Sequence, residues 1–477
     1  MKAVPTVASD SRKLLPPFEY TSPATCGASK FNPALRLDRP FLLSPMAERP
    51  RLLSDETRGP RSLFALAALS IAVGAFAGLV VAAFRLLLQS ANGWRTSFIL
   101  RAHDWGLFGF LWVTLSIALL ASLAAWLVAR VAPETAGSGI PHVERLLRAG
   151  SLGKPHFIIS VKFLGGLLAI GGGLVLGREG PSVQMGSEIG HLIGSVFQRN
   201  RDECRALLAA GAGASLATAF NAPFAGAIFV LEELVGHFDS AFTITTLGAS
   251  ASAIYVSRLL LGRSPDFHVS SLAYLDFGAF PAILLLGVLM GFLGVAYNRC
   301  ILAALNLTSR FSRFRGTLRA AIIAALVAGV GWFMPLLIGA GDALTQTVLD
   351  GRLLIGALAF GFVLHFFLGP ASYATRTPGG LFAPMLAVGA QAGTLFFMLW
   401  ARFLPFLNAT PQHCAIIGIA AFFASVVRAP LTGIILAVEL TGSFVLFLPM
   451  LVASFVAATV ASLLKSLPIY ESLSEVR

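Results

Sequence analysis

The sequence predicts an all-α protein that crosses a membrane several times and consists of two related halves. Hydrophobic residues make up 56% of the 477 residues and charged residues only 12%, which is more apolar surface than a soluble chain of this length could bury. Most of its apolar stretches are long enough, or nearly so, to cross a hydrocarbon core of about 30 Å. They lie at residues 62–88, 107–131, 157–176, 277–295, 320–338, 355–368 and 445–464.

The chain divides into an N-terminal segment, two membrane halves and a short tail. Residues 1–61 have no sustained apolar period, and we expect a largely disordered cytoplasmic segment. They hold ten basic and six acidic residues, and such flanks favour the cytoplasmic side. No signal peptide is evident, and Met46 opens a stretch that resembles an ordinary start. We expect membrane halves at 62–262 and 263–473, a tail at 474–477 in the cytoplasm and no C-terminal regulatory domain.

Charge and cysteine usage exclude several other classes of protein. The net charge of +12 is typical of basic cytoplasmic loops, whereas a nucleic-acid-binding protein would need a basic, exposed polar domain. The scattered cysteines predict neither a disulfide framework nor a metal site. The Gly-x-Gly strings lie in apolar helices rather than in a dinucleotide-binding unit, and no HExxH or GxSG protease motif occurs. We therefore predict no enzyme, no cofactor and no metal. The cysteines are Cys26, Cys204, Cys300 and Cys414.

An internal repeat relates the two membrane halves. Residues 207–234 resemble residues 414–440, and residues 177–190 resemble residues 379–393. Transporter repeats of this kind relate halves of opposite topology, whose broken helices meet near the midplane. Proline near the start of an apolar run, with glycine before it, favours short helices that begin inside the membrane. The matched prolines are Pro223 with Pro430, 207 positions later, and Pro181 with Pro384, 203 positions later.

The breaks between these helices predict an anion site. A helix N-terminus presents unpaired N–H groups and about half a positive charge. Such ends are expected after residues 137–141 (GSGIP), 177–181 (GREGP) and 379–384 (GGLFAP), and Tyr470 adds a late hydroxyl. Converging ends would hold a small anion without a lysine or arginine that binds it too tightly for rapid release. Glu179 lies at one break, where an acid costs roughly 2.5–3.5 kcal/mol at membrane depth, and we therefore expect it to be functional.

These four ordered features resemble the CLC family of chloride channels and chloride/proton exchangers, in its prokaryotic type. The resemblance covers residues 62–473 and implies a homodimer in a lipid bilayer, most simply the bacterial inner membrane, with one chloride pathway per subunit. It implies that Ser138 and Tyr470 coordinate chloride through their hydroxyls and that Leu381 and Phe382 do so through their amides. Both hydroxyls are present, which favours chloride over nitrate or fluoride. The other anion-site residues implied are Gly139, Ile140, Arg178 and Gly180.

The same resemblance implies how protons are coupled to the anion. Glu179 would be the gating glutamate, because a carboxylate and a chloride compete for the same amides and protonation releases the side chain. Glu233 resembles the internal proton-transfer acid of exchangers, so we expect an exchanger, with a passive channel gated by Glu179 as the alternative. The repeat partner of Glu233 is Leu440, whereas Glu232 has an acidic partner in Glu439. This predicts a structural or solvent-lining role for Glu232.

Three other polar residues leave alternatives open. Lys162 either raises the potential for anions from a distance, or snorkels, or pairs with Glu144. Arg178 either faces an aqueous vestibule and steers anions or has a purely structural hydrogen-bonding role. His142 follows GSGIP where the family often has an acid, a departure that leaves the amides of the site intact.

Overall fold

The computed structural model describes residues 60–149, 155–269, 272–310, 316–401 and 409–475. The segment expected at 1–61 therefore lies outside the described residues except for its last two, which begin the first helix. Within the described ranges the chain forms helices and connections without a strand, which confirms the all-α prediction. An isolated bridge between Gly177 and Gly380 is the one β-type pairing in these ranges.

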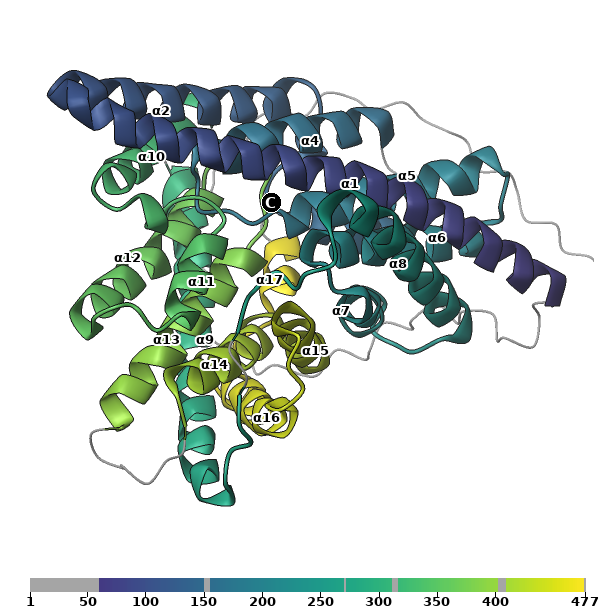
Figure 1. The fold of residues 1–477 in the computed structure, drawn as a ribbon. Coiled ribbons are helices and arrows are strands. Elements are labelled where there is room, and N and C mark those ends of the chain that lie inside the picture. Colours follow the sequence, from purple (N-terminus) through teal and green to yellow (C-terminus); the bar gives the residue numbers. More distant parts are fainter. Residues whose placement is uncertain (1–59, 150–154, 270–271, 311–315, 402–408, 476–477) are drawn as a thin grey trace, which may run out of the picture. The chain divides into compact units, whose positions relative to one another are not determined.

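The helices are grouped by the two halves expected from the sequence (Figure 1). The first half contains α1 (Pro60–Ala102), α2 (Gly106–Arg130), α3 (Ile140–Ala149), α4 (Pro155–Gly172), α5 (Glu179–Val196), α6 (Arg201–Phe220), α7 (Pro223–Phe229) and α8 (Ser240–Leu261). The second half contains α9 (Phe280–Arg310), α10 (Gly316–Phe333), α11 (Asp342–Leu349), α12 (Ile355–Tyr373), α13 (Phe382–Trp400), α14 (Pro411–Val427), α15 (Pro430–Thr441) and α16 (Phe447–Leu463), and α17 (Ile469–Glu475) follows.

Short helices join these elements, and the long ones suit a bilayer. A π-helix, η4 (Val230–Val235), continues α7. Each of the seven apolar stretches predicted from the sequence lies mainly within a helix. Seven helical segments of the described residues are long and apolar enough to cross a membrane. The 3₁₀ helices are η2 (His103–Trp105), η3 (Pro133–Thr135), η5 (Phe277–Ala279) and η6 (Pro335–Leu337).

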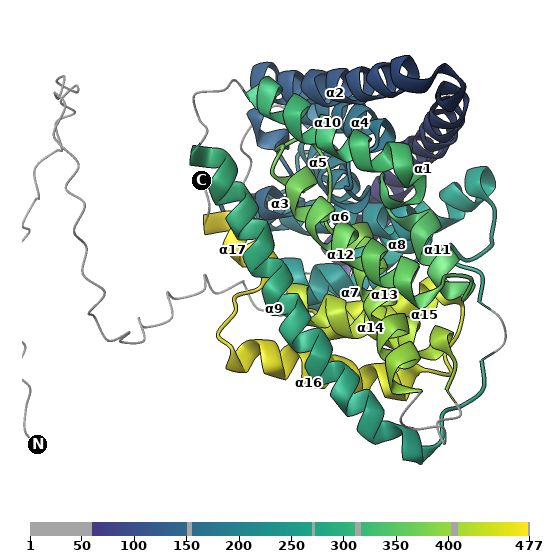
Figure 2. The ribbon, with the colours of Figure 1, turned by 90° about the vertical axis from the view of Figure 1, so that its left-hand side faces the viewer.

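Helix packing repeats between the halves. Helix α5 packs on α6 as α13 packs on α14, and α8 contacts α1 and α6 as α16 contacts α9 and α14. The halves meet through pairs of repeat partners, since α2 packs against α10 and α7 against α15 (Figures 1 and 2). Contacts between partners are expected near an axis that relates the two halves, which supports the predicted inverted repeat.

Small residues bring the buried helices together in both halves. A Cβ on Gly211 of α6 would lie 2.0 Å from the carbonyl oxygen of Gly186 in α5. The corresponding Cβ on Gly418 of α14 would lie 2.4 Å from the carbonyl oxygen of Gly389 in α13. Such close backbone approach is typical of helix pairs in membranes, where packing rather than the hydrophobic effect drives association.

The predicted helix starts are confirmed. The five prolines singled out in the sequence all occupy the first turn of a helix, where the missing N–H has no intrahelical partner to lose. Several short helices therefore begin within the folded interior, directly after glycine-containing loops. These prolines are Pro141 in α3, Pro181 in α5, Pro223 in α7, Pro384 in α13 and Pro430 in α15.

Candidate functional site

The loops before α5 and α13 meet in a symmetric bridge. The amide of Gly177 donates to the carbonyl of Gly380 at 2.9 Å, and the amide of Gly380 donates back to Gly177 at 2.7 Å. The two glycines are 203 positions apart, which is the repeat offset in this part of the chain. Each is therefore bonded to its own counterpart, and the bridge lies at the axis that relates the halves.

The Glu179 carboxylate occupies the amino end of α13. Glu179 is fully buried, and the amide of Phe382, its repeat partner, donates to Oε1 at 2.5 Å. The site has no spare volume, because a Cβ on Gly177 would lie 2.1 Å from Oε2 and one on Gly380 would lie 2.3 Å from Oε1. Leu381, also buried, is the N-cap of the same helix. The structure thus places a carboxylate on amides that suit a compact monoanion.

Ser138 lies at the start of α3, against the residue that follows Glu179. Its hydroxyl is buried and has no hydrogen-bond partner among the described residues. A Cβ on Gly180 would lie 2.6 Å from the Ser138 hydroxyl, so the α3 and α5 starts touch. Gly139 and Ile140 complete the α3 start, and both are buried. The amide of Ser138 donates to the Tyr373 hydroxyl at 3.3 Å, a contact that no motif in the sequence predicts.

Tyr470 reaches the site from the end of the chain, because α17 packs against both α3 and α14. Its ring is fully buried, with a centroid 5.9 Å from that of Phe382. Its hydroxyl faces that of Ser138, and Glu179 is the first of the charged groups that act on it. No hydrogen-bond partner lies within 3.5 Å of either hydroxyl in the described ranges. Two buried hydroxyls without partners are costly, and they indicate a site shaped for a polar or charged ligand.

Lys162 is held under the Ser138 loop. It is fully buried in α4, and Nζ donates to the carbonyl oxygen of Gly137 at 2.7 Å. The predictions that it snorkels or pairs with Glu144 are wrong, because its ammonium is committed to this carbonyl instead. The amine lies one residue from Ser138, and the remaining alternative, that it raises the potential for anions, stays a prediction.

Arg178 has the structural hydrogen-bonding role considered for it and also lines a cavity, whereas anion steering stays a prediction. The side chain lines a cavity of about 390 Å³ on the Glu179 side, yet its guanidinium donates to the Ala219 carbonyl at 2.8 Å and to Asp342 and Asp266 at 2.7 and 3.0 Å. The sequence reasoning missed both aspartates. Asp266 lies in a connection without a motif, whereas Asp342 follows a glycine pair that matches the one around Ser138, a signal that was available.

A smaller cavity of about 170 Å³ opens on the Ser138 side. Gly137 and Gly139 line it together with His142, Arg145 and Arg376. His142 also lies 3.4 Å from the Glu188 carboxylate. Two cavities with arginines thus adjoin the site, one at the residue before Glu179 and the other at the residues that flank Ser138.

Glu233 lies apart from Glu179 in η4, which packs against α3, α6 and α7. It is partly buried, and Glu144 and Glu471 are among the acids that influence it. Tyr470 interacts electrostatically with both Glu233 and Glu179. Glu144 lies on α3, outside the membrane-spanning segments, and burial raises its pKa from 4.5 to about 7.

The adjacent acid, Glu232, caps a helix of the other half. Its carboxylate accepts two backbone amides in the first turn of α15, and Glu439 accepts two in the first turn of α7 in the same way. The predicted structural role of Glu232 is confirmed, and the exchange of caps is itself symmetric. The donors are Leu431 and Thr432 at 3.0 and 2.7 Å for Glu232, and Phe224 and Ala225 at 3.1 and 2.7 Å for Glu439.

Comparison with known proteins agrees with this geometry. A profile of the family described as "Voltage gated chloride channel" matches residues 118–462. The chain is 36% identical over 444 residues to a protein of Vibrio cholerae serotype O1 named "H(+)/Cl(-) exchange transporter ClcA", covering 91% of this chain and 94% of that one. A protein of the same name from Yersinia pestis is 34% identical over 436 residues, covering 89% and 90%.

Solved structures share the fold. A slow cyanobacterial Cl⁻/H⁺ antiporter superposes with a TM-score of 0.83 and 29% identity, over 88% of this chain and 98% of that one. A eukaryotic CLC transporter superposes with a TM-score of 0.74 at 24% identity, over 86% and 74%. The profile match and the relatives above 30% identity together show that this chain belongs to the voltage-gated chloride channel (CLC) family.

Proposed function

We propose that this protein exchanges chloride for protons across a membrane. One observation carries the proposal: the Glu179 carboxylate accepts the Phe382 amide at the start of α13, beside the unpartnered hydroxyls of Ser138 and Tyr470. A chloride has the same charge as the carboxylate and would take the same donors. Relatives that match along nine-tenths of the chain are named as H⁺/Cl⁻ exchangers, which supports coupled transport over a passive channel.

The chloride ligands in this proposal are hydroxyls and amides rather than cations. Ser138 and Tyr470 supply hydroxyls, and the starts of α3, α5 and α13 supply amides. Lys162 stays one carbonyl away, at 2.7 Å from the Gly137 oxygen, and adds potential without direct coordination. Such a site holds the ion loosely enough for release. The amides belong to Gly139, Ile140, Gly180, Leu381 and Phe382.

Proton coupling follows from competition for these donors. While Glu179 is ionised, its carboxylate fills the amide site at α13. Protonation removes the charge, weakens the bond to the Phe382 amide, and lets chloride take the site. Chloride departure reverses the step. Glu233 would supply protons from the other side, and its acidic side chain favours the exchanger over the channel gated by Glu179 alone.

We further propose a homodimer in the bacterial inner membrane with both termini in the cytoplasm. Glu232 and Glu439 are only partly buried, next to exposed Phe224 and Leu431 on the short helices α7 and α15. Carboxylates that faced lipid would be costly, whereas a second subunit over this face would shield them.

Liposomes containing the purified full-length protein test the exchange. A chloride gradient should drive protons uphill against an imposed pH gradient, and the reversal potential should depend on both gradients. Glu179→Gln, which mimics the protonated form, should move chloride without driving protons. A wild-type reversal potential that ignores the pH gradient would mean a channel, and proton pumping that persists in the variant would contradict the role of Glu179.

A further inference from the structure

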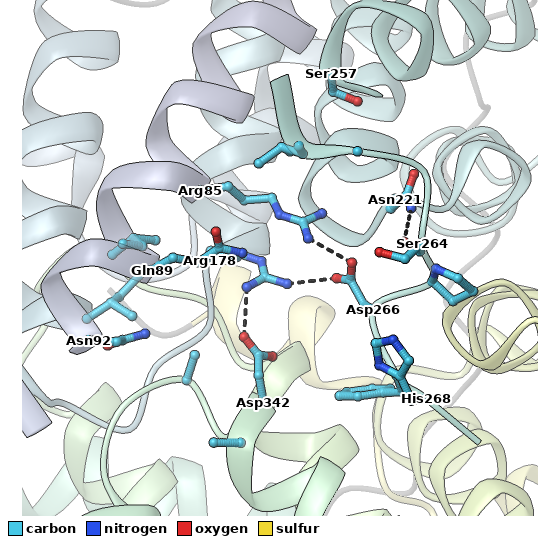
Figure 3. Close-up of a pocket in the computed structure, with 18 residues that line it drawn as sticks. Arg85, Gln89, Asn92, Arg178, Asn221, Ser257, Ser264, Asp266, His268 and Asp342 are labelled. Carbon is cyan, nitrogen blue, oxygen red and sulfur yellow. Dashed lines mark hydrogen bonds and ion pairs between the residues drawn. The ribbon is translucent and has the colours of Figure 1, made fainter. Parts of the chain in front are cut away.

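The cavity beside Arg178 contains a charged network that the exchange step does not use. Arg85 and Arg178 both donate to Asp266, at 2.7 and 3.0 Å, and Arg178 also donates to Asp342 at 2.7 Å. Figure 3 shows these four side chains converging at the cavity, with Asp342 below Arg178 and Asp266 to its right. The network balances two positive charges with two negative ones.

The two carboxylates differ in how firmly they are held. Asp266 has a side-chain exposure of 10% and bridges both arginines. Asp342 has a side-chain exposure of 37% and one ion-pair partner among the described residues, Arg178. Exposed ion pairs contribute little to stability, so Asp342 is the carboxylate that can leave without dismantling the network.

Asp342 stands at the start of a helix that repeats the Ser138 helix. Gly137 and Gly139 before α3 have φ angles of +66° and +89°, and Gly339 and Gly341 before α11 have +88° and +90°. Each loop also bonds to the other half, since Gly379 donates to Gly137 at 3.2 Å and Gly339 donates to Gly173 at 2.9 Å. The same backbone thus presents a helix N-terminus to each of the two cavities.

The side chains on this backbone differ between the halves. Ser138, with its unpartnered hydroxyl, stands between the first glycine pair, whereas Ala340 stands between the second and Asp342 follows it. Ala340 and Asp342 both line the larger cavity. Arg85, which is 6% exposed, lines it too and has a buried Nε without a hydrogen-bond partner in the described ranges. The second loop therefore has the backbone shape of the first, and the carboxylate that follows it pairs with Arg178 at 2.7 Å.

We propose that Arg178 and the amino end of α11 form an outer site for a chloride-sized anion, which the Asp342 carboxylate occupies until an arriving anion displaces it. Asp342 is then a specificity-determining residue that sets how readily anions are captured from the larger cavity. The inference rests on the proposed function in one respect, namely that this cavity leads to Glu179. Arg178 is next to Glu179 in sequence, so a captured anion is one residue from the gate.

Anion binding to Asp342→Asn tests this site. The amide keeps the shape of the side chain and removes its charge. The chloride concentration for half-maximal transport should therefore fall about fivefold when chloride is supplied on the cavity side, and it should be unchanged when chloride is supplied on the other side. Asp350→Asn makes the same charge change at the other end of α11 and should shift neither side. Solid-supported membrane recordings with chloride on one side give both values.

A direct measurement separates this site from the exchange mechanism. Bromide-soaked crystals of Asp342→Asn should show an anomalous peak between Arg178 and the start of α11. If Asp342→Asn is not monodisperse in detergent, Asp342→Ser serves as the second variant. Equal shifts in Asp342→Asn and Asp350→Asn, or no peak in the neutral variant, would overturn the outer site. Absence of proton coupling in the wild type would instead contradict the proposed function. The bromide peak would still support the outer site.

Discussion

The starts of α5 and α13 have nearly the same backbone but different chemistry. Both follow glycine loops, both place a proline in the first turn, and Gly177 and Gly380 bond to each other across them. The first start carries Glu179, whereas the second carries Phe382. The Phe382 ring packs edge-on against that of Phe423, with 4.7 Å between the ring centroids. The repeat therefore supplies a pair of helix ends, and a single acidic side chain in one copy turns them into a titratable site.

The acids at the ends of α7 and α15 show the same contrast. Glu232 and Glu439 are retained in both halves, and each caps a helix of the other half. Glu233 has no acidic counterpart, because Leu440 stands at the matching position. The acids Glu232 and Glu439, present in both copies, hold the halves together. We assign proton chemistry instead to Glu179 and Glu233, which have no acidic counterpart.

Glu233→Leu, which copies the second half into the first, should have the largest effect. It should abolish chloride-driven proton movement while chloride flux continues, since the side chain that accepts protons is gone. A pH-sensitive dye and a chloride electrode on the same liposomes measure both. Glu232→Gln is the neighbouring control and should keep coupling. Proton pumping that persists in Glu233→Leu would contradict the proton-transfer role that we assign to Glu233.

Gly380→Ala tests whether the bridge between the halves holds Glu179 in place. The added Cβ would lie 2.3 Å from Glu179 Oε1 and 2.8 Å from the Gly180 amide, so the carboxylate must move. We expect a loss of about 1–3 kcal/mol in the free energy of unfolding, seen as a lower apparent melting temperature in detergent. Gly329→Ala, where a Cβ meets nothing within 4 Å, is the control. Equal melting temperatures for the two variants would contradict the tight site.

The reciprocal caps should be similar in strength, with Glu232 the stronger because it also accepts the Thr432 hydroxyl at 2.7 Å. Glu232→Ala and Glu439→Ala each remove a carboxylate from two backbone amides, and each should lower the free energy of unfolding by about 1–2 kcal/mol. Melting temperatures of the two variants, measured side by side, should show a somewhat larger loss for Glu232→Ala. A larger loss in Glu439→Ala would contradict this order.

Glu144→Gln should have the smallest effect, visible as a change in pH dependence. Burial raises the pKa of Glu144 from 4.5 to about 7, so the folded protein binds a proton that the unfolded chain releases between these values. Its contribution to stability therefore falls as pH rises from 4.5 to about 7 and then levels off. The variant should flatten the melting temperature over this window, whereas Glu475→Gln, at an exposed site, should not. An unchanged pH profile in Glu144→Gln would contradict the raised pKa.

Local patterns in the sequence predicted much of the site. Proline after glycine marked the helix starts, and the repeat offset matched Glu179 with Phe382 before their contact was known. The partners of Lys162 and Arg178 were not predictable in this way, because they lie on segments far apart in the chain. Lys162 donates to the Gly137 carbonyl rather than pairing with Glu144. Arg178 pairs with Asp266 and Asp342 because the two halves pack against each other.

The sequence by itself determined the membrane class, the repeat, the helix starts and the acid at a break, since these depend on composition and on periodic or local signals. Only the tertiary structure decided what that acid touches. Glu179 meets the Phe382 amide, Tyr470 returns from the last helix to the same place, and one aspartate of the second half pairs with Arg178 at the start of α11. Such contacts depend on how two halves pack around an axis, and no local interaction energy encodes that packing.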